Sequence, residues 1–129
     1  MINFTTIETP IRDIIALVYA CVGLDINLVP DAWCRGHGGS VRSAEYVIRL
    51  RGPHDIAVDP LTEGGYVLTT DLRDDHVARE VGVGCRDLLE AYDFHRTRRQ
   101  REARELDLDA SGRIEANDPV LLTLEGGTS

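Results

Sequence analysis

Lysine is absent from this 129-residue chain, so all 14 basic side chains are arginines. They are outnumbered by 22 aspartates and glutamates, which gives a formal net charge of −8. Because contacts to phosphates require a positive field, this balance argues against general nucleic-acid binding.

Paired cysteines are also lacking. Cys21, Cys34 and Cys85 are odd in number and form no C-x-x-C motif. A disulfide framework needs paired cysteines. A zinc site usually consists of two close pairs of ligands, but the sequence contains only one such pair, Cys34 and His37. We therefore expect buried, reduced thiols in a cytoplasmic protein, and histidines on loops or helix surfaces.

No apolar run is long enough to span a membrane. The longest, Ile14 to Val22, has nine residues, whereas a membrane helix needs about 20. A signal peptide would begin with a basic region, but Glu8 and Asp13 precede this run together with a single arginine, Arg12. We expect neither a membrane span nor export, and the run predicts a largely buried helix.

β-prone segments with short connections predict an antiparallel sheet. The expected strands are 4–7, 26–29, 32–34, 44–50, 55–58 and 66–70. The expected helices are 10–22, 76–81 and 86–105. Thr9 would cap the first helix, with Pro10 at its first position. Leu88, Leu89, Tyr92 and Ala103 would form the inner side of the last helix.

These segments predict one α+β domain with an antiparallel sheet of about four to six strands packed against two main helices. Its 43% of hydrophobic residues is sufficient for a packed core. Residues 1–106 would form the body, and 107–129 a C-terminal tail.

Several stretches of the chain resemble a known family. They are Phe4 to Thr9 and Ile11 to Asp13 at the opening, Ala44 to Arg49 and His54 to Ala57 in the middle, Gly65 to Leu68 and Thr70 to Asp71 further on, and Leu89 to His95. They are similar to the hypothetical chloroplast reading frame thirty-five family, whose short members occur in plastids, cyanobacteria and other bacteria. The resemblance covers residues 3–106. Leu72-Arg73 replaces an aromatic pair of the family.

The family has no known function, so the resemblance implies no catalytic residue. Its members are often encoded beside a small companion protein and an AAA-type ATPase. The resemblance therefore implies an adaptor subunit for such a partner.

Residues 107–118 have the ligand spacing of an EF-hand or dockerin-like calcium loop. Gly112 lies at position 6, where such a loop turns sharply. The ligands at positions 1, 3, 5, 7, 9 and 12 would be Asp107, Asp109, Ser111, the Arg113 carbonyl, Glu115 and Asp118. The alternative is a hairpin with strands at 113–116 and 120–124, which the family resemblance favours.

A basic segment, Arg96 to Glu105, precedes this loop. It contains five arginines and two glutamates, so its net charge is +3, and the other residues carry −11. Such asymmetry is typical of a docking surface for an acidic partner, although a solvated helix end has the same pattern. The candidate partner-binding residues are Arg96, Arg98, Arg99, Arg101 and Arg104.

A third candidate region is the glycine-rich loop from Cys34 to Ser40. It lacks the Gly-Lys-Ser/Thr of a phosphate-binding loop and shows no spacing of nucleophile and base.

The leading hypothesis is thus a non-enzymatic intracellular binding or adaptor subunit that acts through the basic helix. A calcium-binding module at 107–118 is the first alternative, and a small enzyme with its site at 34–40 is the second.

Overall fold

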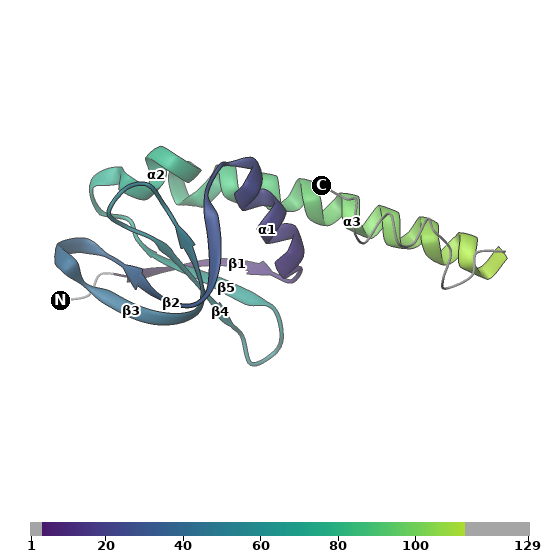
Figure 1. Cartoon of the computed structure of the whole chain (residues 1–129), viewed down its shortest axis with the longest axis horizontal. Helices are drawn as coiled ribbons and strands as arrows, with labels where there is room; N and C mark the ends of the chain where they lie inside the picture. The colour runs from purple at the N-terminus through teal and green to yellow at the C-terminus, as the bar shows by residue number, and fades with distance from the viewer. Residues whose placement is uncertain (1–3, 113–129) are drawn as a thin grey trace. The chain divides into compact units, whose positions relative to one another are not determined.

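A computed structural model describes residues 4–112, with the backbone alone at residues 8–10, 37 and 107–112. Figure 1 shows the course of the chain. The strands are β1 (Phe4–Ile11), β2 (Asn27–Arg35), β3 (Val41–Arg49), β4 (Ile56–Pro60) and β5 (Tyr66–Asp71). The helices are α1 (Ile14–Gly23), α2 (His76–Val81) and α3 (Arg86–Gly112), and single 3-10 turns lie at His37–Gly39, Arg73–Asp75 and Val83–Cys85.

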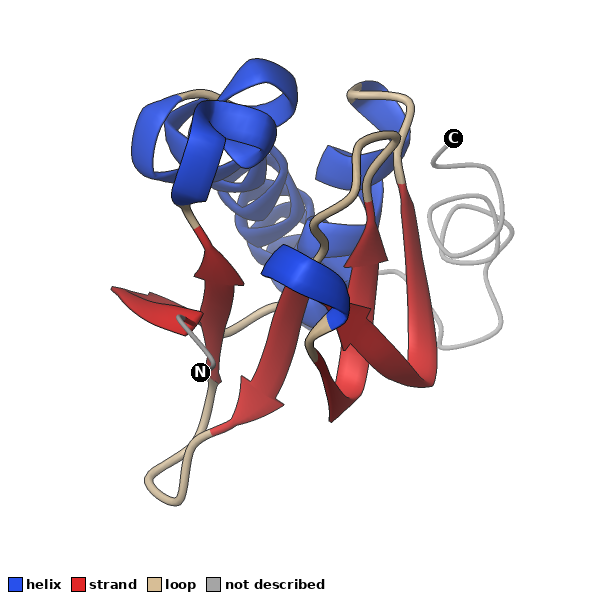
Figure 2. Cartoon of the chain, turned by 90° about the vertical axis from the view of Figure 1, so that its left-hand side faces the viewer, coloured by secondary structure: helices blue, strands red, loops and turns tan. Residues whose placement is uncertain are grey.

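The five strands form one antiparallel sheet in the order β1-β5-β4-β3-β2, which confirms the α+β class. Helices α1 and α2 and the beginning of α3 cover one face of the sheet (Figures 1 and 2). The chain divides into two compact units, Met1–His95 and Arg96–Ser129. The boundary between them falls within α3.

The prediction that a helix begins at residue 10 is wrong, because β1 continues to Ile11. Ile7 and Ile11 are four residues apart but pair with Leu68 and Tyr66, which are two apart, so β1 has an irregularity at this point. Pro10 lies in that irregularity on an edge strand, where its missing N–H disrupts no regular ladder.

Asp13, rather than Thr9, caps α1. Its Oδ1 accepts hydrogen bonds from the N–H groups of Ile15 at 3.1 Å and Ala16 at 3.2 Å. This is the geometry of an N-cap. The preceding residues are also held, because the Tyr92 hydroxyl oxygen accepts from the N–H groups of Arg12 at 2.8 Å and Asp13 at 3.0 Å.

The strand predictions at 26–29 and 32–34 correspond to a single strand, β2. Pro30 and Asp31, expected to separate two strands, are both included, although Asp31 has a φ of +53°. β2 is at the edge of the sheet, where a residue without an N–H is tolerated.

The β2–β3 hairpin is strongly curved, so that its tip lies against the segment between β3 and β4. Arg35 pairs with Val41 at the hairpin tip, yet its Nη2 donates to the Leu50 carbonyl oxygen at 3.0 Å. The Asp55 N–H donates to the Arg35 carbonyl oxygen at 2.9 Å. Gly36 lacks room for a side chain, since a Cβ there would lie 2.9 Å from Cζ of Phe4.

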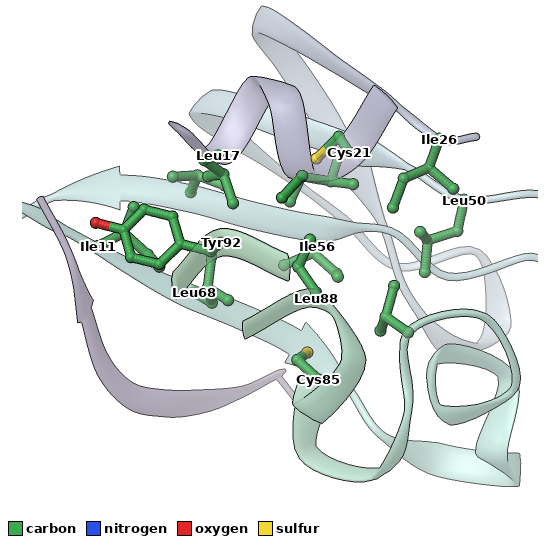
Figure 3. Close-up of a cluster of buried hydrophobic side chains, with 14 of the residues drawn as sticks. Ile11, Leu17, Cys21, Ile26, Leu50, Ile56, Leu68, Cys85, Leu88 and Tyr92 are labelled. Carbon is green, nitrogen blue, oxygen red and sulfur yellow. The ribbon is translucent and has the colours of Figure 1, made fainter. Parts of the chain in front are cut away.

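This curl gives the sheet a core on both faces. Ile48, Ile56 and Leu68 point toward the helices and meet residues of α1 and α3, as Figure 3 shows for the last two. Val47 and Ala57, on the opposite face, are covered by the curled hairpin. The residues of this second cluster are Cys34, Ala44, Val47 and Ala57, with Phe4, Val29 and Ala32 packed against them.

α1 is less buried than its sequence predicts. Leu17 and Cys21 lie against the sheet (Figure 3), whereas Ile15, Val18 and Val22 are exposed. A helix packed on one face of a single sheet buries only one stripe, even when all of its residues are apolar.

α2 occupies the predicted residues, and α3 extends beyond the predicted end at residue 105 to Gly112. Leu88 and Tyr92 are buried as predicted and Leu89 is half-buried, but Ala103 is exposed. Among the helices of residues 4–112, none is both long and apolar enough to cross a membrane.

Candidate functional site

The basic segment Arg96 to Glu105 lies within α3 and belongs to the second unit. Arg98, Arg101 and Arg104 are exposed, whereas Arg96 and Arg99 are half-buried. The Arg96 guanidinium Nη1 lies 3.4 Å from Oε1 of Gln100, one turn along the helix. The five candidate arginines therefore differ in their availability to a partner.

The three exposed arginines share one side of the helix. They follow one another at intervals of three residues, so they lie within about 120° around the helix axis. Glu105 lies on the same side, and Glu102 is half-buried. The structure thus brings Arg98, Arg101 and Arg104 together as a row of cations, which we call the arginine row.

The proposed calcium loop begins inside α3. Its first six positions, Asp107 to Gly112, are helical, whereas a calcium loop needs a sharp turn at position 6. Arg113, Glu115 and Asp118 lie outside the described residues, as do both strands of the alternative hairpin. The described residues therefore do not test the whole calcium loop, and calcium binding there would require the end of α3 to unwind.

Asp55 lies at the centre of a charged cluster that the sequence analysis did not identify. Its side chain is fully buried, and its two carboxylate oxygens accept from Nε and Nη2 of Arg35, each at 2.8 Å, and from Nη1 of Arg49 at 2.8 Å. The N–H groups of Arg35 and Leu50 also donate to it, both at 3.1 Å. The carboxylate thus accepts five hydrogen bonds, which engage both of its oxygens.

Several influences act on the pKa of Asp55. Burial is the largest and raises the pKa, but the hydrogen bonds from the Arg35 side chain and from the two N–H groups outweigh it, together with the positive charge of Arg35. The resulting pKa lies below its ordinary value. Asp55 is therefore ionised at neutral pH and stabilises the fold; it is not poised to exchange a proton.

His54 lies on the loop between β3 and β4, as expected of a loop histidine, but it is buried, with 2% of its area exposed. Its Nδ1 donates to the Asp71 carbonyl oxygen at 3.1 Å, because a carbonyl can only accept. Its ring meets that of His76 edge-on, with centroids 4.8 Å apart. Where side chains are described, no three His, Cys, Asp or Glu residues form a group suited to a metal ion.

The 34–40 loop has little catalytic potential in this structure. Burial, with a smaller effect of the Asp55 charge, raises the pKa of the Cys34 thiol to about 12. A nucleophilic cysteine needs the opposite shift, toward the thiolate. The loop contains a 3-10 turn at His37–Gly39, and no helix follows it to form a phosphate site.

Two features escaped the sequence analysis for different reasons. Asp55 directly precedes the apolar residues Ile56 to Val58. An acidic residue next to a buried strand is common, so this position alone does not indicate a buried ion pair. Its partners Arg35 and Arg49 come from other strands, so no spacing identifies them. The exposed apolar side of α1 could have been predicted from the sequence. A helix that is apolar all around and packs on one face of a sheet must expose some of its apolar side chains.

Comparisons of the chain with protein-family models, curated proteins and solved structures find no match. The similarity to the reading frame thirty-five family therefore stays a prediction that rests on the residues quoted for it.

Proposed function

We propose that the chain is a non-enzymatic binding or adaptor subunit that docks an acidic protein partner on the arginine row of α3. The observation that carries the proposal is the exposure of Arg98, Arg101 and Arg104 on one side of the helix. Three guanidinium groups in a row complement carboxylates, to which arginine donates paired hydrogen bonds.

The charge distribution supports a specific acidic partner. The segment Arg96 to Glu105 carries +3 in a chain of net charge −8. The acidic remainder would repel a polyanion such as nucleic acid, and the segment contains no aromatic residue on which bases could stack. A protein with a local acidic patch fits the row without this repulsion.

The state of the reactive side chains favours binding over catalysis. The Asp55 carboxylate is fully engaged by arginine and backbone donors, and Cys34 is a buried thiol. The family resemblance suggests an AAA-type ATPase or a small companion protein as the partner, and these are the proteins to test first.

Affinity capture with purified AAA-type ATPase or companion protein from the native host tests the proposal. The test variant carries Ala at Arg98, Arg99, Arg101 and Arg104. We expect it to lose capture of the partner while its circular dichroism spectrum stays that of the wild type. Binding of the wild type should weaken as salt is raised, because exposed charges are screened.

A matched control replaces Arg42, Arg51, Arg73 and Arg79 with Ala, which removes the same charge from residues outside α3. If both variants lose capture equally, net charge rather than the arginine row is responsible. Unchanged capture by the α3 variant, or capture only of nucleic acid, would overturn the proposal.

A further inference from the structure

The outward side of α1 is an exposed apolar stripe. Ile15, Val18 and Val22 are 46%, 37% and 68% exposed. They follow one another at intervals of three and four residues, so they lie along one side of the helix. No residue of Ile14–Gly23 is charged. We call these three residues the α1 stripe.

Aromatic side chains flank this stripe. Tyr19, on the same helix, packs against His95 of α3 with ring centroids 5.7 Å apart. His95 also meets Phe94 edge-on at 5.1 Å, and Phe94 is 61% exposed. Exposed apolar side chains that follow one side of a helix, as Ile15, Val18 and Val22 do, mark a contact surface rather than scattered surface residues.

The sequence around α1 reads as a pattern that complements itself in the antiparallel direction. The midpoint between Val18 and Tyr19 is equally far along the chain from Ile15 and Val22. It is also equally far from Arg12 and Asp25, which are exposed at opposite ends of the helix. The charges at the two ends are therefore opposite, and the residues between them are apolar.

We propose that two copies of this chain associate by packing their α1 stripes antiparallel about a two-fold axis at that midpoint. Ile15 of one copy then faces Val22 of the other, and Val18 lies beside the axis. Arg12 of one copy meets Asp25 of the other at both ends. A two-fold contact requires this kind of self-complementary surface.

The charges at the two ends of α1 favour a second copy of this chain, rather than a membrane, as the partner of the α1 stripe. Asp25 already contacts Arg51 in its own chain, but its side chain is 92% exposed, so a second guanidinium can reach it. A membrane-bound helix, in contrast, carries basic residues along its polar side. The opposite side of α1 instead carries Ala16, Leu17, Ala20 and Cys21, which are buried in the core.

Sedimentation equilibrium of the full chain tests the proposal. We expect a species of twice the 14.3 kDa chain mass. Val18→Asp should raise the dimer dissociation constant by about 100-fold or more, because two carboxylates would be desolvated at the axis. Val22→Asp, at the most exposed position of the stripe, should have the same effect if Val18→Asp fails to fold.

Val83→Asp is the matched control, since Val83 is 76% exposed outside α1. It should leave the dimer intact. A monomeric wild type would overturn the proposal and leave the stripe to a partner of different sequence. A dimer that survives both Val18→Asp and Val22→Asp would also overturn it, because the contact would then lie elsewhere.

A charge exchange tests the antiparallel arrangement. Arg12→Asp and Asp25→Arg should each weaken the dimer, and the double variant should recover about tenfold in affinity relative to either single variant. Arg51→Ala controls for loss of the contact within the chain and should have little effect. A double variant weaker than both single variants would overturn the proposed register. This outcome is independent of capture by the arginine row.

Discussion

Arg35 and Asp55 are 20 residues apart in the sequence and are joined by two side-chain hydrogen bonds of 2.8 Å. The pair fixes the tip of the β2–β3 hairpin to the beginning of β4. It therefore holds the curl that encloses the second apolar cluster. The Asp55 carboxylate is buried, whereas the guanidinium groups of its partners Arg35 and Arg49 are partly exposed. Replacing Asp55 should therefore destabilise the fold more than replacing either arginine.

Asp55→Asn should lower the free energy of unfolding by about 2–4 kcal/mol, since the amide keeps the shape but loses the charge that five donors share. Urea unfolding measures the change. Asp59→Asn is the control, because Asp59 pairs with Arg42 at 2.8 Å but is partly exposed. It should cost less than about 1 kcal/mol. Equal losses would contradict the central role of Asp55.

The same pair makes stability depend on pH. The pKa of Asp55 is depressed in the folded protein from the ordinary value of 3.8, so its ionised form stabilises the fold at higher pH. The contribution is lost as the pH falls through the folded-state pKa. The difference between wild type and Asp55→Asn should therefore be constant near neutral pH and shrink below about pH 4. A difference that grows in acid would contradict this account.

Local signals in the sequence predicted much of this fold. α2 matches its predicted residues because Gly82 ends it, and β5 differs from its prediction only by Asp71. What the sequence could not supply depends on distant partners. The sequence at Pro10 predicts a helix start, and only the pairing of β1 with β5 shows that the strand continues there. The sequence at Asp55 predicts the first residue of a strand, and only the curled hairpin brings Arg35 to its carboxylate.

The three cysteines should be inert in the folded protein. Burial raises the pKa of Cys21 to about 12 and that of Cys85 to about 11, and Cys34 is similarly shifted. At pH 8 we expect reaction with a thiol reagent to be at least about 100-fold slower than in guanidinium chloride, where all three should react. Rapid modification of one thiol per native chain would contradict the buried positions.

Tyr92 should contribute to stability through its hydroxyl group. Tyr92→Phe keeps the buried ring but leaves the N–H groups of Arg12 and Asp13 without their acceptor. We expect a loss of about 1–3 kcal/mol in chemical unfolding. Phe94→Leu, at an exposed position of the same helix, should change stability by less than about 0.5 kcal/mol. A neutral Tyr92→Phe would show that water replaces the hydroxyl.

Calcium should not stabilise the chain, because residues 107–112 are helical and a bound loop would have to unwind them. Thermal melts in EDTA and in graded calcium, with magnesium as the control, measure this. A ligand that binds only the folded state must raise the melting temperature as its concentration passes Kd. A saturating, calcium-selective rise that Asp107→Ala removes would contradict the expectation and establish the loop.

The pairing of β1 with β5 has a consequence for the protein during its synthesis. Phe4 is translated 67 residues before its partner Asp71, an interval of roughly 3–13 s at the ordinary pace of a ribosome. During that time α1 can form, but the sheet that buries Leu17 and Cys21 is incomplete. In the nascent chain, both the core-facing side and the outward side of this apolar helix are therefore exposed to solvent. We expect chaperones to bind α1 during this interval.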